Sequence, residues 1–455
     1  MRKTTILFMV LTALLLVSVS ASAQKLWSLE DCINYAFENN IQIKQSKLTV
    51  ESSKADYLQS KLNFLPSLNL SANQNTSWGR SLDRSTYTYT NQQTKQLYGS
   101  VSSSLTLFNG FQNINQMRQQ QFAYLAQKYN SDNIRDNISL NIAAAYLQIL
   151  YNVEQVKNSE RQLQTSEDQV SMTKKEVEVG TLAKGNLLDV EAQAASDKVN
   201  LVSAQNKLML AYLDLMQLLD LKASTKFDID KPNLEITRKP SLLPISNIYN
   251  KALTIMPQIK SAEYNVKSAD RSLAVARGMR SPKLSLASSY GNNYSNQITN
   301  PDGSLKPFWD QFKDNGSINL GFSLSIPIFN GFQTETYIKK SKINLENAEL
   351  NLTLQKNNLR KSIEQAYTDA LAAYQTYIAS SKSVESLKEA FKYSQEKFNV
   401  GLLSATDFNV AKNNYYNAVS NLTAAKYDYI FKTKILDFYL GRSMSLSDIA
   451  SIKSN

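Results

Sequence analysis

Four short stretches of the chain alternate between apolar and polar residues. The clearest covers 318–328, where every second residue is apolar and the intervening residues are small or polar. The others are 67–73, 101–107 and 284–286, and the apolar face of the second of these includes Leu107. A period of two is typical of a strand with one buried face. An apolar face set against a small polar face suits a transmembrane barrel with lipid on one side and water on the other.

The strands alone leave two architectures open, because an ordinary β-sandwich alternates too. Four strands do not close a barrel, since the smallest spanning barrels have about eight, so a barrel would need several copies of the chain. The polar stretches 80–95 and 296–314 are expected as outside loops. Aromatic residues at or beyond the outer strand ends suit a membrane interface or, alternatively, the turns of a soluble hairpin: Trp78, Tyr87, Tyr89, Tyr290, Tyr294, Phe308 and Trp309.

Two much longer stretches have a period of seven. Apolar residues recur every seven positions at Ile142, Ile149, Val156, Leu163, Val170 and Val177, and again at Ile363, Ala370, Tyr377, Val384, Phe391 and Phe398. A sustained heptad predicts left-handed supercoiling of long helices against partner helices. Neither proline nor glycine interrupts 112–178 or 333–399, so each helix is expected to run for about 100 Å. Gly180 and Gly401 would end these helices, and a second periodic helix follows each of them.

The chain is an internal duplication. Phe108-Asn109-Gly110-Phe111-Gln112 recurs as Phe329-Asn330-Gly331-Phe332-Gln333, an offset of 221 residues that continues downstream, whereas the offset upstream is 216. We expect a signal peptide (1–23), a first repeat of helix, strand pair and helical hairpin (24–221), a linker (222–244), a second repeat of the same plan (245–441) and a tail (442–455). The linker, interrupted by prolines, is expected to add at most a short helix or strand outside the main body.

The first residues have the pattern of a cleaved secretion signal. Arg2 and Lys3 precede the apolar stretch 6–19, and small residues at 21–23 suit signal peptidase, so Gln24 is expected to begin the mature chain. The apolar stretch is shorter than the roughly 20 residues of a spanning helix, which favours a signal over a membrane anchor. The single cysteine, Cys32, does not follow the cleavage site directly, so a lipid anchor is not expected.

The composition disfavours catalysis and nucleic-acid binding. The chain contains no histidine, which removes the commonest general base and metal ligand, and we expect no catalytic residue, cofactor or metal site. The net charge of +11 is spread along the chain as mixed charges, without a basic cluster interleaved with aromatic residues.

The duplication, the strands that follow Pro66 and Pro282, the two Phe-Asn-Gly motifs and the Val-Gly-x-Leu turns together resemble the TolC-like outer membrane efflux proteins. The resemblance covers essentially the whole mature chain. It implies a mixed α and β fold in which a homotrimer combines four strands per protomer into a twelve-stranded outer-membrane β-barrel. Long antiparallel, coiled-coil-like helical hairpins would form an α-barrel in the periplasm.

The function implied by this resemblance is that of a non-catalytic duct for efflux or type I secretion in the cell outer membrane. The helical tips would dock onto a periplasmic adaptor and an inner-membrane pump of the RND or ABC type, and outer membrane lipid would surround the barrel. We expect docking at the tip residues Gly180, Thr181, Leu182, Gly401, Leu402 and Leu403, although these residues would also serve simple turn geometry.

Family members often carry acidic residues six and nine positions after each tip glycine, at a narrow periplasmic mouth. In this chain Asp407 lies six positions after Gly401, and Asp189 lies nine positions after Gly180. Three-fold symmetry would turn each into a ring of three carboxylates that favours cations. The alternative is that both are helix-start acids stabilised by the helix dipole.

Two other classes of protein remain as alternatives. A periplasmic coiled-coil adaptor also has a long helical hairpin, but it lacks the paired amphipathic strands. A passive porin has the strands but does not explain helices of about 100 Å.

Overall fold

The computed structural model describes residues 26–82, 86–222, 226–232, 234, 236, 243–442 and 444–446. The chain divides into two units. The first contains the chain up to Gln45, Asn133–Met256 and the chain from Asn358 onward, and the second contains Ser46–Asp132 and Pro257–Asn357. The predicted signal peptide, 1–23, and the end of the predicted tail, 447–455, lie outside the described residues.

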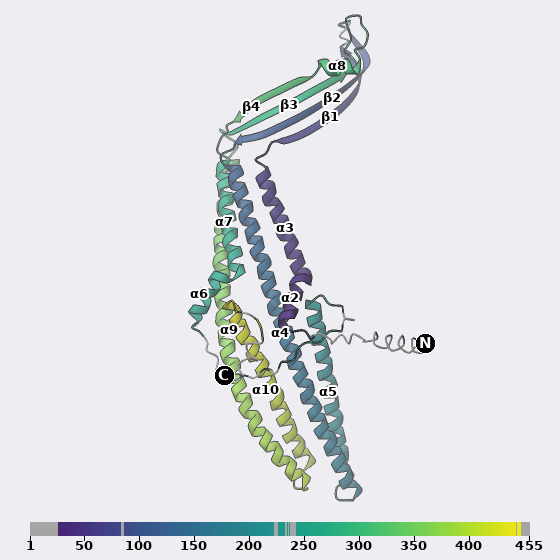
Figure 1. Ribbon diagram of the computed structural model, residues 1–455, viewed down its shortest axis with the longest axis vertical. Helices are drawn as coiled ribbons and strands as arrows, with labels where there is room; N and C mark the ends of the chain where they lie inside the picture. The colour runs from purple at the N-terminus through teal and green to yellow at the C-terminus, as the bar shows by residue number, and fades with distance from the viewer. Residues whose placement is uncertain are drawn as a thin grey trace, which may run out of the picture. The chain divides into compact units, whose positions relative to one another are not determined.

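Among the described residues, four antiparallel strands of the second unit form one sheet in the order β1-β2-β3-β4 (Figure 1). Their bounds are β1 (Ser67–Leu82), β2 (Tyr89–Phe108), β3 (Lys283–Ser295) and β4 (Ser317–Ser325). Each of the four stretches with a period of two contributes one strand, so this part of the prediction is confirmed.

The register of the sheet aligns residues of like polarity in rows. One row contains Leu70, Val101, Tyr290 and Ile318, and the row beside it contains Asn69, Ser102, Ser289 and Asn319. Because successive residues point to opposite faces, one face is mainly apolar and the other is small and polar. Leu70 is 80% exposed and Ile318 is 82% exposed, so the described residues leave the apolar face uncovered.

The apolar face of β2 differs from the prediction at its end. Thr106 pairs with Ser285, but Phe108, not Leu107, pairs with Leu284. Leu107 is therefore the extra residue of a β-bulge, and Phe108 takes the place on the apolar face that the alternation assigned to Leu107.

Both predicted outside loops contain regular structure, which corrects the expectation. β1 extends to Leu82 and β2 begins at Tyr89, so most of 80–95 is a paired hairpin. Within 296–314, α8 (Phe308–Asp314) forms a short helix, and Thr299 pairs with Leu305. The hairpin has polar residues on both faces, so the sequence shows no period of two there, although the backbones of the two strands remain paired.

The long helices end where the sequence predicts. They are α4 (Gln112–Glu178) and α9 (Gln333–Asn399), of 67 residues each, and they are followed by α5 (Lys184–Leu218) and α10 (Ala405–Tyr439). The shorter helices are α2 (Leu29–Asn39), α3 (Ile41–Leu62), α6 (Ile245–Ile255) and α7 (Pro257–Gly278). In the part of the chain that the structure describes, no helix is both long enough and apolar enough to cross a membrane.

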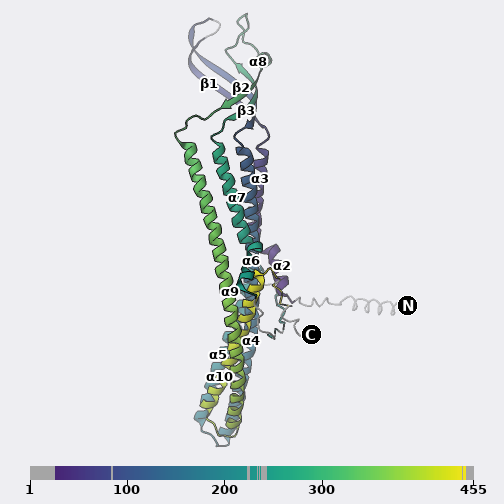
Figure 2. The ribbon, with the colours of Figure 1, turned by 90° about the vertical axis from the view of Figure 1, so that its left-hand side faces the viewer.

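The two hairpins, α4–α5 and α9–α10, belong in large part to the first unit (Figure 2). Ile142 and Ile149 on α4, and Ile363 and Ala370 on α9, are completely buried. The period-seven positions therefore form the inner stripe of each long helix, as the heptad predicts.

The described part of the linker packs into the core of the first unit, contrary to the expectation of a segment outside the main body. Ile229 is fully buried and pairs with Trp27 in a parallel bridge, and the hydroxyl of Tyr146 donates to the carbonyl oxygen of Asp230 at 2.6 Å. Phe227 and Ile229 alternate with Asp228 and Asp230, a short period of two that indicates a paired segment. The predicted repeat boundaries around this segment stay a prediction.

The duplication is visible in the backbone. Ser67 pairs with Ser104, and the residues 216 and 221 positions further on, Lys283 and Ser325, pair in the same way. The two Phe-Asn-Gly turns also match, since Phe111 and Phe332 both have φ of 59°. The internal duplication is therefore preserved in strand register and in turn geometry.

Candidate functional site

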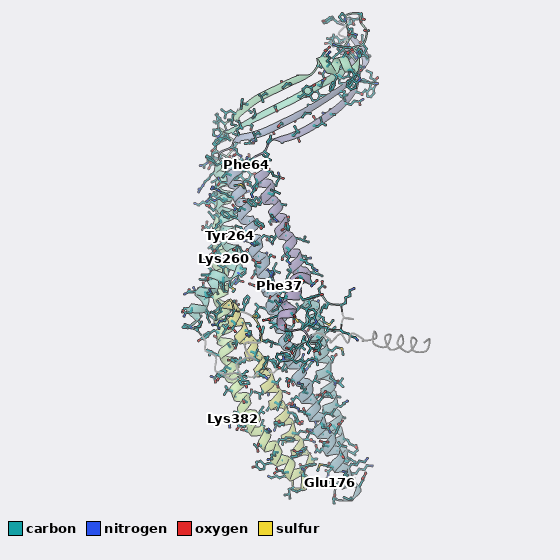
Figure 3. All side chains as sticks on the ribbon, viewed as in Figure 1. Phe37, Phe64, Glu176, Lys260, Tyr264 and Lys382 are labelled. Carbon is teal, nitrogen blue, oxygen red and sulfur yellow. The ribbon has the colours of Figure 1, made fainter. Side chains whose placement is uncertain are left out.

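The tip of the α4–α5 hairpin is closed by hydrogen bonds to the carbonyl oxygen of Glu176, a residue labelled in Figure 3. The N–H groups of Thr181 and Leu182 donate to this oxygen at 2.9 and 3.3 Å, and the Thr181 hydroxyl donates at 2.8 Å. Gly180 has φ of +79°, a left-handed conformation that glycine adopts without strain. These contacts end α4 with the C-terminal glycine that the sequence predicts.

The tip of the α9–α10 hairpin has the same turn but a larger apolar core. Gly401 has φ of +75°, and the N–H of Leu402 donates to the carbonyl oxygen of Lys397 at 2.9 Å. An aromatic cluster lies behind the turn and contains Phe391, Phe398 and Phe408. The equivalent positions of the first tip hold Val170, Val177 and Leu187. The second tip therefore has the more extensive aromatic packing.

A cleft of about 670 Å³ lies between the two tips. It brings together five of the predicted docking residues, namely Thr181, Leu182, Gly401, Leu402 and Leu403. Gly180 does not line the cleft. Leu402 is 77% exposed, so the cleft presents apolar surface to solvent. This arrangement could receive a narrow apolar segment of a partner protein.

The two predicted gate acids lie near the tips but outside the cleft lining. Asp407 is exposed in the first turn of α10, where its carboxylate accepts a hydrogen bond from the Ser404 hydroxyl at 2.7 Å. Its own N–H donates to the Ser404 oxygen at 3.1 Å, so Asp407 takes part in capping α10. Asp189 is exposed on α5. Both carboxylates are thus accessible to ions.

The predicted interface aromatics occupy three different elements. Trp78 lies on β1 and Trp309 on α8, each 74% exposed, whereas Tyr290 lies on β3 in the apolar row with Ile318. Beside β3, the α8 helix forms an aromatic cluster in which Phe308 contacts Tyr294 at a ring distance of 5.3 Å (Figure 1). Amphipathic rings of this kind favour the boundary between lipid and water.

A buried ion pair near the hairpin ends escaped the sequence analysis. Lys412 on α10 is completely buried, and its Nζ lies 2.9 Å from Oδ2 of Asp197 on α5. The Ser166 hydroxyl donates to the same carboxylate oxygen at 2.6 Å, and Gln162 donates to the other at 2.9 Å. Burial lowers the pKa of Lys412, while the Asp197 carboxylate acts in the opposite direction. The pair joins α5 of the first hairpin to α10 of the second, and Ser166 and Gln162 connect α4 to it.

Further polar contacts join α4 to α10 along the same line. The Asn158 amide donates to the carbonyl oxygen of Tyr416 at 3.1 Å and to the Ser420 hydroxyl at 2.6 Å. Polar residues at 158, 162, 165 and 169 of α4 have the spacing of three and four residues that places side chains on one face of a helix. This spacing could have predicted the polar contact from the sequence. The sequence analysis considered only the apolar heptad, which lies on another face of α4.

Comparison with known proteins identifies the chain's relatives. A family model described as outer membrane efflux protein matches residues 32–220 and 248–442. The chain is 22% identical over 408 residues to the outer membrane efflux protein BepC of Brucella suis, covering 90% of this chain and 84% of the relative. It is 24% identical over 435 residues to the toluene efflux pump outer membrane protein TtgI of Pseudomonas putida, covering 91% and 85%.

Solved structures show the same fold. The structure of CusC matches with a TM-score of 0.78 at 18% identity and covers 91% of this chain and 92% of that chain. The outer membrane protein VceC of Vibrio cholerae matches with a TM-score of 0.74 at 16% identity, covering 92% and 97%. Since the family model matches both halves, the chain belongs to the outer membrane efflux protein family.

Proposed function

We propose that three copies of this chain form one duct across the outer membrane. As a member of its family the chain is an outer-membrane efflux channel of the TolC type. In the proposed assembly each copy contributes four strands to a closed barrel and two helical hairpins to a periplasmic tube. The tips dock onto a periplasmic adaptor and an inner-membrane pump of the RND or ABC type, for efflux or type I secretion. The name of TtgI, the outer membrane protein of a toluene efflux pump, supports a place in such a pump.

The unpaired edges of the sheet support the proposal that several copies of the chain assemble. Within the described residues β1 and β4 are the outer strands of the sheet, and each pairs with a strand on one side only. A sheet edge in hydrocarbon is unfavourable, because each unpaired backbone group costs several kcal/mol there. Strands from other copies would satisfy these edges, and three copies supply twelve strands, more than the roughly eight of the smallest spanning barrels.

The assembly is tested by recovering the protein from membranes. We expect it in outer-membrane fractions as a trimer that dissociates on heating and conducts ions in planar bilayers. A soluble monomer in the periplasm would overturn the proposal and favour an adaptor. A conducting trimer that supports no pump-dependent export would favour a passive porin.

The cleft between the tips is the proposed adaptor site. Replacing Leu182 or Leu403 with aspartate is expected to reduce pump-dependent export at least tenfold, because about 1.4 kcal/mol of lost binding lowers affinity tenfold. A charge in the cleft would have to be buried without a partner when the adaptor binds. The measurement is export in cells, together with adaptor pull-down by the purified trimer.

Val179 provides a matched control for the cleft. It lies beside the first tip, is 75% exposed and does not line the cleft, so Val179→Asp adds the same charge outside the proposed site. Export should remain near the wild-type level in this variant. Intact export and adaptor binding in the Leu182 and Leu403 variants, with the trimer preserved, would contradict docking in the cleft.

The acidic gate is tested by ion block. Asp407→Ala is expected to weaken block of single-channel current by multivalent cations roughly fivefold, the equivalent of about 1 kcal/mol for one charge pair at 4 Å in water. Ser404→Ala is the control, since it removes the cap of α10 and keeps the carboxylate. Unchanged block in Asp407→Ala, or equal loss in both variants, would contradict the gate and leave Asp407 as a capping residue.

A further inference from the structure

The polar face of the sheet carries a single charged residue within the four strands. By the strand register, this face holds the odd-numbered residues of β1, β3 and β4 and the even-numbered residues of β2 up to Thr106. All of them are serine, threonine, asparagine, glutamine, glycine, alanine or tyrosine, except Lys283. The other charged residues of the strands, Arg80 and Lys95, belong to the opposite face. The polar face is therefore neutral except at one position.

This face would line the inside of the proposed barrel. The other face carries the apolar rows that suit lipid, so the polar face is the one that meets water. A hollow of about 450 Å³ lies on the polar face, and its lining includes Ser67 of β1 and Asn319 of β4. Because both outer strands line one hollow, the sheet curves toward its polar face, as a barrel around water requires.

Lys283 lies at the end of the sheet that joins the helices. It is the first residue of β3, which follows α7, and its partner in the register, Ser325, is the last residue of β4 (Figure 1). Its side chain is exposed, and in the part of the chain that the structure describes no ion pair involves it. Glu335, at the start of α9, accepts a hydrogen bond from Nε of Arg280 at 2.9 Å instead. The Lys283 ammonium is thus available to an anion in the lumen.

The duplication places a serine at the equivalent position of the first repeat. The offsets of 216 and 221 residues map Ser67 onto Lys283 and Ser104 onto Ser325. In the first repeat the hydroxyls of Ser67 and Ser104 lie 2.9 Å apart and share a hydrogen bond. Strand pairing at this row therefore does not require a lysine, and its charge needs another explanation.

We propose that three Lys283 side chains, one from each copy, form a ring inside the base of the barrel that binds extended polyanions. The inference rests on the trimer of the proposed function, because one copy supplies only one ammonium group. A twelve-stranded barrel is wider than the side-chain-filled barrels of about eight strands, so a small anion would contact one ammonium at a time. A chain with several phosphate, sulfate or carboxylate groups can contact all three.

The chemistry of the wall favours such a ligand. Lysine is a compact point charge on a flexible stem, so it accepts anions of different geometry. The strands supply no carboxylate on the polar face that would neutralise the ring. Serine, asparagine and glutamine side chains along the wall can donate hydrogen bonds to the same chain.

Block of the current by dextran sulfate tests the ring. This polyanion is added to the extracellular side of trimers in planar bilayers at low salt, since the Debye length is about 30 Å at 0.01 M. Lys283→Ser copies the first repeat into the second and removes the ring, whereas Ser67→Lys copies the second into the first and doubles it. We expect the concentration for half block to rise roughly tenfold in Lys283→Ser, which loses its charge contacts with the chain, and to fall in Ser67→Lys.

Lys95→Ser is the matched control, because it removes the same charge from the opposite face of the sheet. Block of this variant should equal that of the wild type. Uncharged dextran of the same length measures simple obstruction. Equal block by the two polymers, unchanged block in Lys283→Ser, or an equal loss in Lys95→Ser would overturn the ring. A protein that forms no conducting trimer would instead overturn the proposed function.

Reversal potentials in a salt gradient give a second readout that needs no polymer. At low salt the preference for anions should fall in Lys283→Ser and rise in Ser67→Lys, because the helical tips are the same in both variants. The differences should disappear near 1 M salt, where the Debye length is about 3 Å. Identical reversal potentials of the wild type and Lys283→Ser at low salt would count against the ring.

Discussion

Asp197→Leu is expected to lower the free energy of unfolding by about 3–5 kcal/mol, the typical effect of removing one partner of a buried pair. Lys412 would then be buried without its carboxylate, and Ser166 and Gln162 would lose an acceptor. The measurement is thermal unfolding of the purified protein, followed by circular dichroism.

The double variant Asp197→Leu with Lys412→Met is the matched control. It removes both charges and keeps apolar groups of similar size, so most of the lost stability should return. A single variant that unfolds at the wild-type temperature would contradict a structural role for the pair. A double variant no more stable than the single one would show that volume, rather than charge, limits the site.

Gly110→Ala is expected to destabilise the protein by about 2–5 kcal/mol, from overpacking together with strain at positive φ. A Cβ atom at Gly110 would lie 2.4 Å from Cβ of Ser281 and 2.5 Å from the carbonyl oxygen of Gly278, with φ of +65°. The backbone of the turn and the end of α7 would therefore have to move apart. Denaturant unfolding of both variants, Gly110→Ala and Gly331→Ala, measures the difference.

Gly331→Ala is the control supplied by the duplication. Gly331 has φ of +61°, nearly the same conformation, but a Cβ there meets no atom of the described residues within 4 Å. The Gly331→Ala variant should lose only the stability that corresponds to backbone strain at positive φ, about 1–3 kcal/mol. Equal destabilisation by the two substitutions would mean that Gly331 is also enclosed, as packing against another copy of the chain would do.

The candidate site could be predicted in part. The Val-Gly-x-Leu turns identified both tips, because a glycine at the end of a long helix is a local signal. That Leu182 and Leu403 line one cleft was not available from the sequence, since they are far apart in the chain and belong to different hairpins. The capping contact of Ser404 with Asp407 was readable in principle from their spacing of three residues.

The sequence by itself determined the existence of the four strands, the two 67-residue helices, the turns that end these helices and the duplication. Each of these depends on a period or a turn residue within a short stretch, so local physical chemistry is sufficient. Only the tertiary structure decided the bulge at Leu107, the packing of Ile229 into the core and the pairing of Lys412 with Asp197. Those features depend on contacts between residues that are far apart in the sequence. Such contacts are strongly selected in a buried environment, because a buried charge or an unpaired backbone group is costly unless a partner satisfies it.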